Sequence, residues 1–238
     1  MKNAIILTSG GLDSTVLAYF TRKKLGYENI KIIFFDYGQK AVKEEEFCCE
    51  RLSKDLGAEL KKIELKWLGE ISTSSINVKG AFPKTKEEDL EKEDKNLIDW
   101  WVPCRNSIFL INSMAFAESE FLRNKRLYDI FIGLINEGRS FMNDTTNEFI
   151  DKINELSEHS TFNGKYRIIA PLLNSDKADV IKIGAEIGVP FEYTYSCYIG
   201  ENSKNRTLVH CGMCLNCMLR KKSFYWANLK DVTEYKEE

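Results

Sequence analysis

A short apolar run that leads directly into a glycine-containing loop constrains the fold of this chain more than any other feature. Residues 4–7 are continuously apolar, as expected for a strand buried on both faces of a parallel sheet. Residues 9–15, Ser-Gly-Gly-Leu-Asp-Ser-Thr, follow as a turn, and Val16, Leu17 and Phe20 then mark the inner face of a helix. A buried strand, a glycine turn and a helix in succession predict the first βα unit of an α/β fold.

The same alternation of strands and helices continues along the chain. Further strands are predicted at residues 30–35, 60–65, 130–133 and 168–170, and further helices at residues 42–56, 106–122, 149–156 and 177–187. We therefore predict a doubly wound parallel sheet of the Rossmann-like type, with ligands bound beyond the carboxyl ends of its strands. The 238 residues suffice for one substantial core, which we assign to residues 1–190, followed by a small C-terminal segment, residues 191–238.

Charge and hydropathy exclude several classes of protein. Lysine and arginine number 34 against 36 acidic residues, which disfavours direct binding to nucleic acid. No apolar stretch is long enough to span a membrane, and the N-terminus lacks a cleavable signal, so we expect a cytoplasmic protein. Residues 84–99 are mostly charged and read as a solvated loop, with a mobile lid over the active site as the alternative. The sequence leaves the oligomeric state open, a homodimer included.

The loop after the first strand has the composition of a phosphate-binding turn. Gly10 and Gly11 let the backbone approach an anion closely, and the amides and dipole of the following helix favour negative charge. Asp13 could hold the Mg²⁺ that accompanies a polyphosphate. The sequence is neither a Walker motif nor a dinucleotide loop, and taken alone it could equally be a turn that caps a helix. The residues that we assign to ATP here are Thr8, Ser9, Gly10, Gly11, Leu12, Asp13, Ser14 and Thr15.

A cysteine cluster near the C-terminus predicts a metal site. Cys211, Cys214 and Cys217 have Cys-x2-Cys-x2-Cys spacing, and Cys197 is the nearest remaining sulfur for a fourth ligand, with His210 as the alternative. Structural Zn²⁺ is the preferred interpretation and an iron–sulfur cluster is the alternative. The other cysteines comprise two predicted to lie in the core and one whose role stays open: Cys48, Cys49 and Cys104.

These motifs together resemble a known group of enzymes. Ser-Gly-Gly-x-Asp-Ser directly after the first strand resembles the signature of the N-type ATP pyrophosphatases, which have an adenine nucleotide alpha hydrolase-like fold and leave AMP on the substrate. Within that group, the whole chain resembles the 7-cyano-7-deazaguanine synthase (QueC) family. The matching segments are residues 8–15, 35–39, 102–107, 132–133, Asp144 with 148–149, 171–172 with Lys177, 196–198 and 210–220.

The resemblance implies a reaction. Such an enzyme converts 7-carboxy-7-deazaguanine and ammonia to the nitrile and spends ATP to AMP. A carboxylate is a poor electrophile, so adenylation supplies the leaving group. Ammonia then gives an amide, and a second activation allows the amide to be dehydrated.

The resemblance also implies roles for individual residues. Asp36, Tyr37 and Gln39 would line the nucleotide pocket together with the loop. Asp13, Arg105 and Lys177 would be catalytic, the two cations acting on phosphate or on developing negative charge. For these two cations the alternative is a surface ion pair. For Asp144 and Glu148, assigned to the substrate below, the alternative is a helix N-cap and a first-turn acid. The residues assigned to the deazaguanine substrate are Arg105, Asn106, Gly133, Asp144 and Glu148.

Some residues depart from the family pattern in the acceptor half of the site. Typical members have Cys-Arg-Pro where this chain has Thr145, Thr146 and Asn147, and Arg-His where it has Lys40 and Ala41. An alternative function is therefore a relative that couples the same carboxylate to another amine, such as a protein N-terminus. Two further alternatives are a zinc-dependent binding module with a vestigial loop and a sulfur-transferring relative that uses Cys104.

Overall fold

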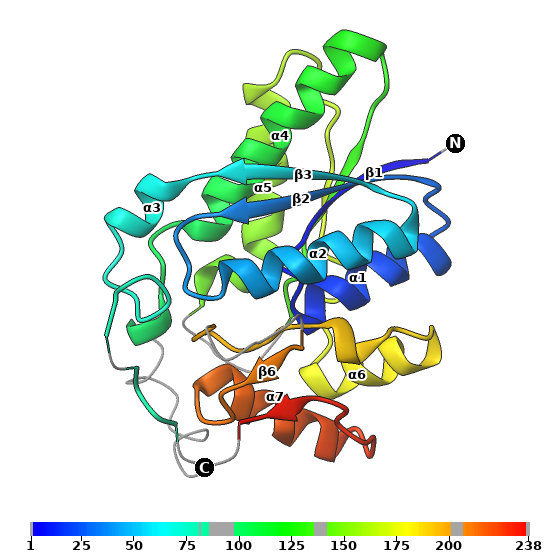
Figure 1. Cartoon of the computed structure of the whole chain (residues 1–238). Coiled ribbons are helices and arrows are strands. Elements are labelled where there is room, and N and C mark those ends of the chain that lie inside the picture. The colour runs from blue at the N-terminus through cyan, green and yellow to red at the C-terminus, as the bar shows by residue number, and fades with distance from the viewer. Residues whose placement is uncertain (1, 81, 86–97, 136–141, 201–206, 237–238) are drawn as a thin grey trace.

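The computed structural model describes residues 2–80, 82–85, 98–135, 142–200 and 207–236. Its central feature is one sheet of five parallel strands in the order β3-β2-β1-β4-β5 (Figure 1). The strands are β1 (Asn3–Leu7), β2 (Asn29–Asp36), β3 (Glu59–Glu64), β4 (Asp129–Phe131) and β5 (Ile168–Ile169). The central strand, β1, pairs with β2 on one side and with β4 on the other, so the direction of winding reverses beside β1.

Helices cover both faces of the sheet. The helices α4 (Arg105–Asn124) and α5 (Asn147–Ser160) lie on one side, and α1 (Leu12–Lys23), α2 (Val42–Leu56) and α6 (Lys177–Glu186) lie on the other (Figure 1). This arrangement confirms the predicted doubly wound α/β fold.

The alternation of side chains along β1 explains why two layers of helices form. Ile5 and Leu7 point to the face that α4 covers, whereas Ala4 and Ile6 point to the face that α1 covers. Because successive side chains of a strand point to opposite faces, an apolar run such as residues 4–7 needs apolar partners on both sides.

The C-terminal segment continues the core of the sheet. A pair of short parallel strands, β6 (Val209–His210) and β7 (Glu234–Tyr235), lies beside α7 (Leu215–Trp226), and α7 packs against α6 (Figure 1). The apolar cluster on the α4 face extends without interruption to the buried cysteines of this segment. The division at residue 190 stays a prediction.

The elements follow the predicted boundaries closely in the N-terminal half. The predicted helix at residues 42–56 coincides with α2, which ends at Gly57 in the left-handed conformation. The predicted alternating strand is β3, at one edge of the sheet. The elements that sequence patterning did not identify are short or C-terminal: α3 (Lys66–Glu70), the 3₁₀ turns Ile98–Trp100, Asn143–Thr145 and Phe191–Tyr193, and β6, α7 and β7.

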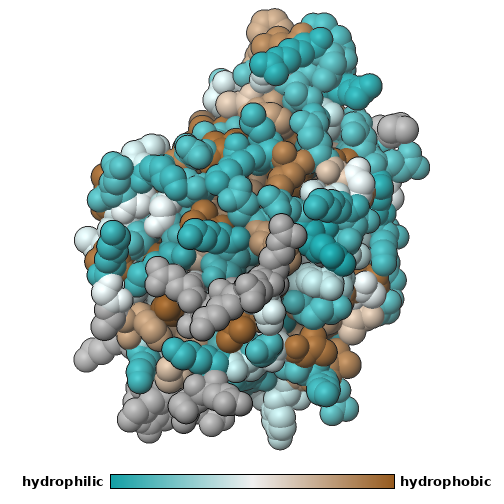
Figure 2. Space-filling model, in the orientation of Figure 1, coloured by the Kyte–Doolittle hydropathy of each residue, from teal (hydrophilic) through white to brown (hydrophobic). Residues whose placement is uncertain are grey.

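The surface and the charged insertion complete the description. The face seen in Figure 2 is largely hydrophilic, with apolar side chains in small separate areas. Across the described ranges, no helix combines the length and the apolar character needed to cross a bilayer. Most of the predicted lid, residues 86–97, lies outside the described residues. At its N-terminal border the Thr85 amide donates to the carbonyl of Met213 at 2.9 Å, next to the cysteine cluster.

Candidate active site

A cavity of about 680 Å³ opens at the carboxyl ends of β1, β2 and β4, where the strand order reverses. Open α/β sheets bind their ligands at such a point. Among the described elements, four helices begin at this cavity, because the first residues of α1, α4, α5 and α6 (Leu12, Arg105, Asn147 and Lys177) all line it. Their amide groups and dipoles favour an anionic ligand. The predicted site residues that line the cavity are Thr8, Ser9, Gly11, Leu12, Asp13, Ser14, Tyr37, Arg105, Asn106, Gly133 and Lys177.

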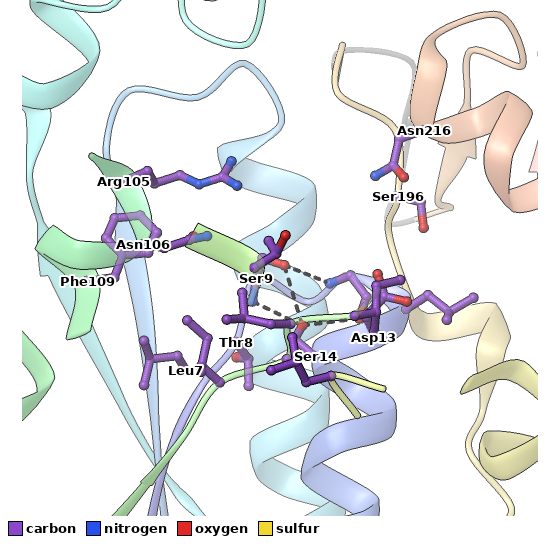
Figure 3. Close-up of a pocket in the computed structure, with 18 of the residues that line it drawn as sticks. Leu7, Thr8, Ser9, Asp13, Ser14, Arg105, Asn106, Phe109, Ser196 and Asn216 are labelled. Atoms are coloured by element: carbon purple, nitrogen blue, oxygen red, sulfur yellow. Dashed lines mark hydrogen bonds between the residues drawn. The ribbon is translucent and has the colours of Figure 1, made fainter. Parts of the chain in front are cut away.

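The loop between β1 and α1 is held by its own hydroxyl groups. The Ser9 amide donates to Ser14 Oγ at 3.2 Å, and the Gly11 amide donates to Ser9 Oγ at 3.3 Å. Ser14 Oγ in turn donates to the carbonyl of Gly11 at 3.3 Å. These contacts keep the loop in one conformation with Ser9, Asp13 and Ser14 at the cavity wall (Figure 3).

Two glycines permit close packing of backbone at this loop. Gly10 has φ +68°, and a Cβ there would lie 2.6 Å from Cys48 Cβ and 2.6 Å from the carbonyl oxygen of Glu45. Gly133, just beyond β4, would place a Cβ 3.1 Å from the Cα of Ser14. Gly10 therefore needs glycine, whereas a side chain at Gly133 would require the backbone of Ser14 to shift by a few tenths of an ångström. Gly10 itself does not line the cavity.

Asp13 and Lys177 lie together at the cavity. Lys177 Nζ is 3.2 Å from Asp13 Oδ2 and donates to Asn216 Oδ1 at 3.3 Å. The side chain of Asp176 caps α6 by accepting from the Asp179 amide at 2.8 Å, which fixes Lys177 as the first residue of the helix. The loop, α6 and α7 therefore meet at one ammonium group.

Arg105 and Asn106 form another wall, across the cavity from Ser196 and Asn216 (Figure 3). The guanidinium of Arg105 hydrogen bonds to Tyr37. Desolvation would lower the pKa of Arg105, but Tyr37 and its other neighbours raise it, so the charge persists at every accessible pH.

Asp144 lies behind this wall. Asn106 hydrogen bonds to its carboxyl group, and Arg105 stabilises the carboxylate, but burial dominates and raises the pKa of Asp144. Asp144 belongs to the 3₁₀ turn Asn143–Thr145, and the cap of α5 is Thr146, whose Oγ1 accepts from the Phe149 amide at 3.1 Å. Glu148 follows as an exposed residue of α5.

The end of β2 is organised by Gln39. Its Nε2 donates to the carbonyl of Phe35 at 2.9 Å and to Glu45 Oε2 at 2.8 Å, while its Oε1 accepts from the Tyr37 amide at 2.9 Å. Gln39 thus lies one layer behind the cavity and holds Tyr37 and Glu45, which do line it.

Asp36 lies at the end of the same strand, outside the cavity lining, and is nearly fully buried. Burial opposes its charge, but Lys66, 2.5 Å from Oδ1, the Gly38 amide and Lys62 together hold the pKa of the Asp36 carboxyl below its usual value.

The remaining predicted residues lie beside the cavity and do not line it. They are Gly10, Thr15, Asp36, Gln39, Asp144 and Glu148. Sequence patterning did not identify several residues that do line it, because they come from helix faces or from the C-terminal segment. These include Glu45, Phe109, Tyr195, Ser196, Tyr198 and Asn216. The matched segments at residues 196–198 and 210–220 were the available signal for three of them, Ser196, Tyr198 and Asn216.

The four cysteines predicted as metal ligands come together. Cys197, Cys211, Cys214 and Cys217 are all buried, and their sulfur atoms lie within 4.8 Å of one another. The Sγ atoms of Cys211 and Cys217 are 3.9 Å apart. A tetrahedral ion with metal–sulfur bonds of about 2.3 Å needs sulfur atoms about 3.8 Å apart. The sulfur positions therefore fit a four-coordinate metal.

Backbone amides surround the sulfur atoms. The amides of Met213 and Cys214 donate to Cys211 Sγ at 3.4 and 3.3 Å, and the Cys211 amide donates to Cys197 Sγ at 3.4 Å. Gly212, with φ +77°, allows the tight turn between them. Such amide donors stabilise thiolates, as expected of ligands around a metal.

His210, the alternative fourth ligand, does not belong to this cluster. Its Nε2 accepts from the Ser196 amide at 2.9 Å, and burial, followed by the nearby Arg220, lowers the pKa of His210 to about 3. The imidazole is therefore neutral. The fourth position of the cluster belongs to Cys197.

The remaining cysteines lie apart from the cluster. Cys48 and Cys49 are buried in the core, as predicted, and Cys104 is exposed with φ +53° at the start of α4.

The cysteine cluster adjoins the cavity. Cys197 is flanked by Ser196 and Tyr198, and Asn216 precedes Cys217; all three of these neighbours line the cavity. Any ion held by the cysteines therefore fixes one wall of the cavity.

Comparison with known families and proteins adds a family to this geometry. Residues 3–228 match the family described as "Queuosine biosynthesis protein QueC". Proteins called 7-cyano-7-deazaguanine synthase are similar over their whole length. The one from Methanothermobacter thermautotrophicus is 36% identical, covering 98% of this chain and 99% of the relative. The one from Methanocaldococcus jannaschii is also 36% identical, with the same coverage.

Solved structures give weaker matches. The U34-tRNA thiolase NcsA from Methanococcus maripaludis, solved with its [4Fe-4S] cluster, is 14% identical with a TM-score of 0.44; the match covers 95% of this chain and 65% of that protein. The NMN synthetase from Francisella tularensis is also 14% identical, with a TM-score of 0.43 over 95% of this chain and 84% of that one.

Proposed function

Because this chain belongs to the QueC family, we propose that it is an ATP-dependent ligase that adenylates 7-carboxy-7-deazaguanine and converts it with ammonia to 7-cyano-7-deazaguanine. The observation that carries the proposal is the full-length similarity to proteins called 7-cyano-7-deazaguanine synthase. The cavity at the strand reversal supports it, since four helix starts and two cations converge there.

In this proposal the loop from Thr8 to Thr15 cradles the β- and γ-phosphates of ATP, and the base lies toward the end of β2 beside Tyr37. Asp13 holds the Mg²⁺ that accompanies ATP, which suits a carboxylate at a polyphosphate site. Lys177, 3.2 Å from Asp13, and Arg105 on the opposite wall neutralise the charge that develops at the α-phosphate.

The deazaguanine is proposed to bind between Arg105, Asn106 and Gly133. Asp144 lies behind the wall formed by Arg105 and Asn106 and acts through Asn106, to which its carboxyl group is hydrogen bonded. Glu148 is the least supported of these assignments, because it is exposed and lies outside the cavity lining.

The chemistry requires two activations in the same cavity. The substrate carboxylate attacks the α-phosphorus of ATP and releases pyrophosphate; ammonia then displaces AMP and gives the amide. Adenylation of the amide oxygen and loss of a second AMP give the nitrile. The protein contributes geometry and fixed charge, which keep the reacting groups aligned and stabilise the pentavalent phosphorus.

The cysteine cluster is proposed to hold a structural Zn²⁺. Four sulfur ligands leave no open coordination position, so the ion would fix the fold of the C-terminal segment and take no part in catalysis. Metal analysis of the purified protein should find one zinc per chain and a colourless solution, whereas a visible absorption band would indicate an iron–sulfur cluster instead.

The mass of the product tests the proposed function. Purified protein should turn 7-carboxy-7-deazaguanine, ATP, Mg²⁺ and ammonium into the nitrile, with AMP and pyrophosphate as co-products. An amide that accumulates without nitrile would overturn the synthase assignment and favour coupling to another amine, the function suggested by Thr145 and Thr146. Absence of any carboxylate-dependent AMP would overturn the ligase assignment as well.

A further inference from the structure

The proposed reaction removes three protons from nitrogen, one when the amide forms and two when the amide becomes the nitrile, so the cavity should contain a group that accepts them. Among the described residues that line the cavity there is no histidine. The titratable side chains that do line it are Asp13, Tyr37, Glu45, Arg105, Lys177, Tyr195 and Tyr198.

Several of these groups are poorly suited to accepting a proton. Asp13 is paired with Lys177 on the phosphate loop. A guanidinium such as Arg105 cannot act as a base in a protein. Burial raises the pKa of Tyr37 and of Tyr195 far above the usual range, so neither phenol ionises near neutral pH.

Glu45 differs from the others in both position and surroundings. It lies in the first turn of α2, its side chain reaches the cavity, and Gln39 Nε2 fixes it by donating to Oε2 at 2.8 Å. Gln39 is itself anchored at both ends to the backbone of residues 35 and 37. The carboxyl group is therefore held in one place at the cavity.

The electrostatic surroundings tune Glu45 for proton exchange. Burial raises the pKa of its carboxyl group to about 8, although Gln39 and Arg105 oppose the rise. A base with a pKa near the working pH is the most effective in general acid–base catalysis. The charged and titratable groups that face it from β2, α2 and α4 are Asp36, Tyr37, Glu44, Cys48, Cys49 and Arg105.

We propose that Glu45 is a catalytic base that takes up the protons lost by nitrogen, an inference that rests on the proposed function. In the first step ammonia forms a C–N bond with the acyl adenylate. An N–H proton passes to the Glu45 carboxylate, and the bond between carbon and the phosphate oxygen breaks, so that AMP leaves with the electron pair. Glu45 returns the proton to water before its next use in the same turnover.

The second use follows the same logic. Once the amide oxygen carries AMP, the nitrogen still holds two protons. One passes to Glu45 and leaves the neutral imidate, and Glu45 returns it to water. The last N–H proton then passes to Glu45, the N–H electron pair forms the third C–N bond, the bond between carbon and oxygen breaks, and AMP leaves. The first adenylation needs no base, because the substrate carboxylate is already ionised.

The partial reactions of Glu45→Gln test this role. Carboxylate-dependent exchange of labelled pyrophosphate into ATP reports adenylation alone and should stay within about twofold of wild type. Formation of amide and of nitrile, at a fixed concentration of free ammonia, should fall at least ~100-fold. In wild type these nitrogen steps should rise with pH through about 8, as Glu45 ionises. The variant should lose that rise, and Glu45→Asp should recover part of it.

Glu46→Gln is the matched control, because Glu46 is the next residue of α2, pairs with Lys62 at 2.9 Å and does not line the cavity. Its nitrogen steps and pH profile should match wild type. The role of Glu45 is overturned if Glu45→Gln makes amide and nitrile at the wild-type rate, or if it loses exchange together with the nitrogen steps. Absence of exchange in wild type is a separate result, since it removes the proposed function and this inference with it.

Discussion

At the scale of single residues, Glu45 shows how a side chain placed for chemistry acts against stability. Burial raises the pKa of its carboxyl group from 4.5 to about 8 in the folded protein. Between these two values the folded state retains a proton that the unfolded state has released. Stability falls with rising pH wherever the folded state binds more protons, so Glu45 destabilises the fold progressively from about pH 4.5 to about pH 8.

Glu45→Gln should therefore be more stable than wild type at high pH. Glutamine can keep the contact with Gln39 and carries no charge at any pH, so the variant escapes the loss. Its melting temperature should exceed that of wild type by an amount that grows between pH 5 and pH 8, at about 2–4 °C for each kcal/mol. Thermal unfolding followed by circular dichroism across this range measures the difference. A difference that stays constant or shrinks with pH would contradict the assignment.

Some residues of the site can be recognised from the local sequence, and others cannot. Asp13 and the loop around it stand out because a glycine turn directly follows an apolar strand, and they do lie at the cavity. Glu45 and Asn216 give no such signal, since one acid in a helix that contains four consecutive charged residues and one amide between two cysteines look ordinary. Only the packing of α2 and α7 shows that these two side chains reach the cavity.

At the scale of elements, the loop from β1 to α1 and the start of α2 depend on each other through Gly10. A Cβ at this position would lie 2.6 Å from both Cys48 Cβ and the carbonyl oxygen of Glu45, and φ is +68°. Gly26, with φ +71°, has no atom within 4 Å of such a Cβ. The two glycines thus share the same backbone strain, while only Gly10 adds a steric clash.

Gly10→Ala should cost more than Gly26→Ala and should also impair ATP binding. The left-handed conformation costs about 1–2 kcal/mol in each variant. Overpacking against α2 adds about 1–3 kcal/mol at Gly10 alone. The melting temperature should be highest for wild type, lower for Gly26→Ala and lowest for Gly10→Ala. Calorimetry should show weaker ATP binding only for Gly10→Ala. Equal losses in the two variants would show that α2 accommodates the methyl group.

Elements with a strong repeat of apolar side chains were predictable, and short ones were not. The burial pattern of α2 and the apolar character of β1 and β2 gave their boundaries within a residue or two. The strand predicted at residues 130–133 is shorter in the structure, because β4 ends at Phe131, although the Ile132 amide still donates to the carbonyl of Ile169 at 3.1 Å. The strands β6 and β7 have two residues each, too few for any periodicity.

At the scale of the whole molecule, the cysteine cluster and the cavity are coupled, because neighbouring residues of one segment serve both. Residues on either side of Cys197 line the cavity, and Asn216, between Cys214 and Cys217, accepts a hydrogen bond from Lys177. Arg220, which is almost fully buried, adds a second link, because it donates to Ser196 Oγ at 3.1 Å. Sequence spacing predicted that the four cysteines would meet, but their position beside the phosphate loop arises from the packing of α7 on α6.

Removal of the proposed zinc ion should therefore impair the cavity before the sheet unfolds. The negatively charged thiolates would lie together within 4.8 Å without a cation, so they must either take up protons or move apart. Either change displaces Ser196, Tyr198 and Asn216, while the strands of the sheet keep their own core. We expect Cys214→Ser, or chelation of the wild type, to lower the melting temperature by several degrees and to weaken ATP binding at least ~10-fold. The far-ultraviolet circular dichroism should stay near that of the native protein.

Restoring zinc to the chelated wild type should recover both the melting temperature and the affinity for ATP. Cys104→Ser is the matched control, since Cys104 is exposed and outside the cluster, and it should change neither. Wild-type affinity for ATP in the metal-free protein would show that the cavity wall stands without the cluster.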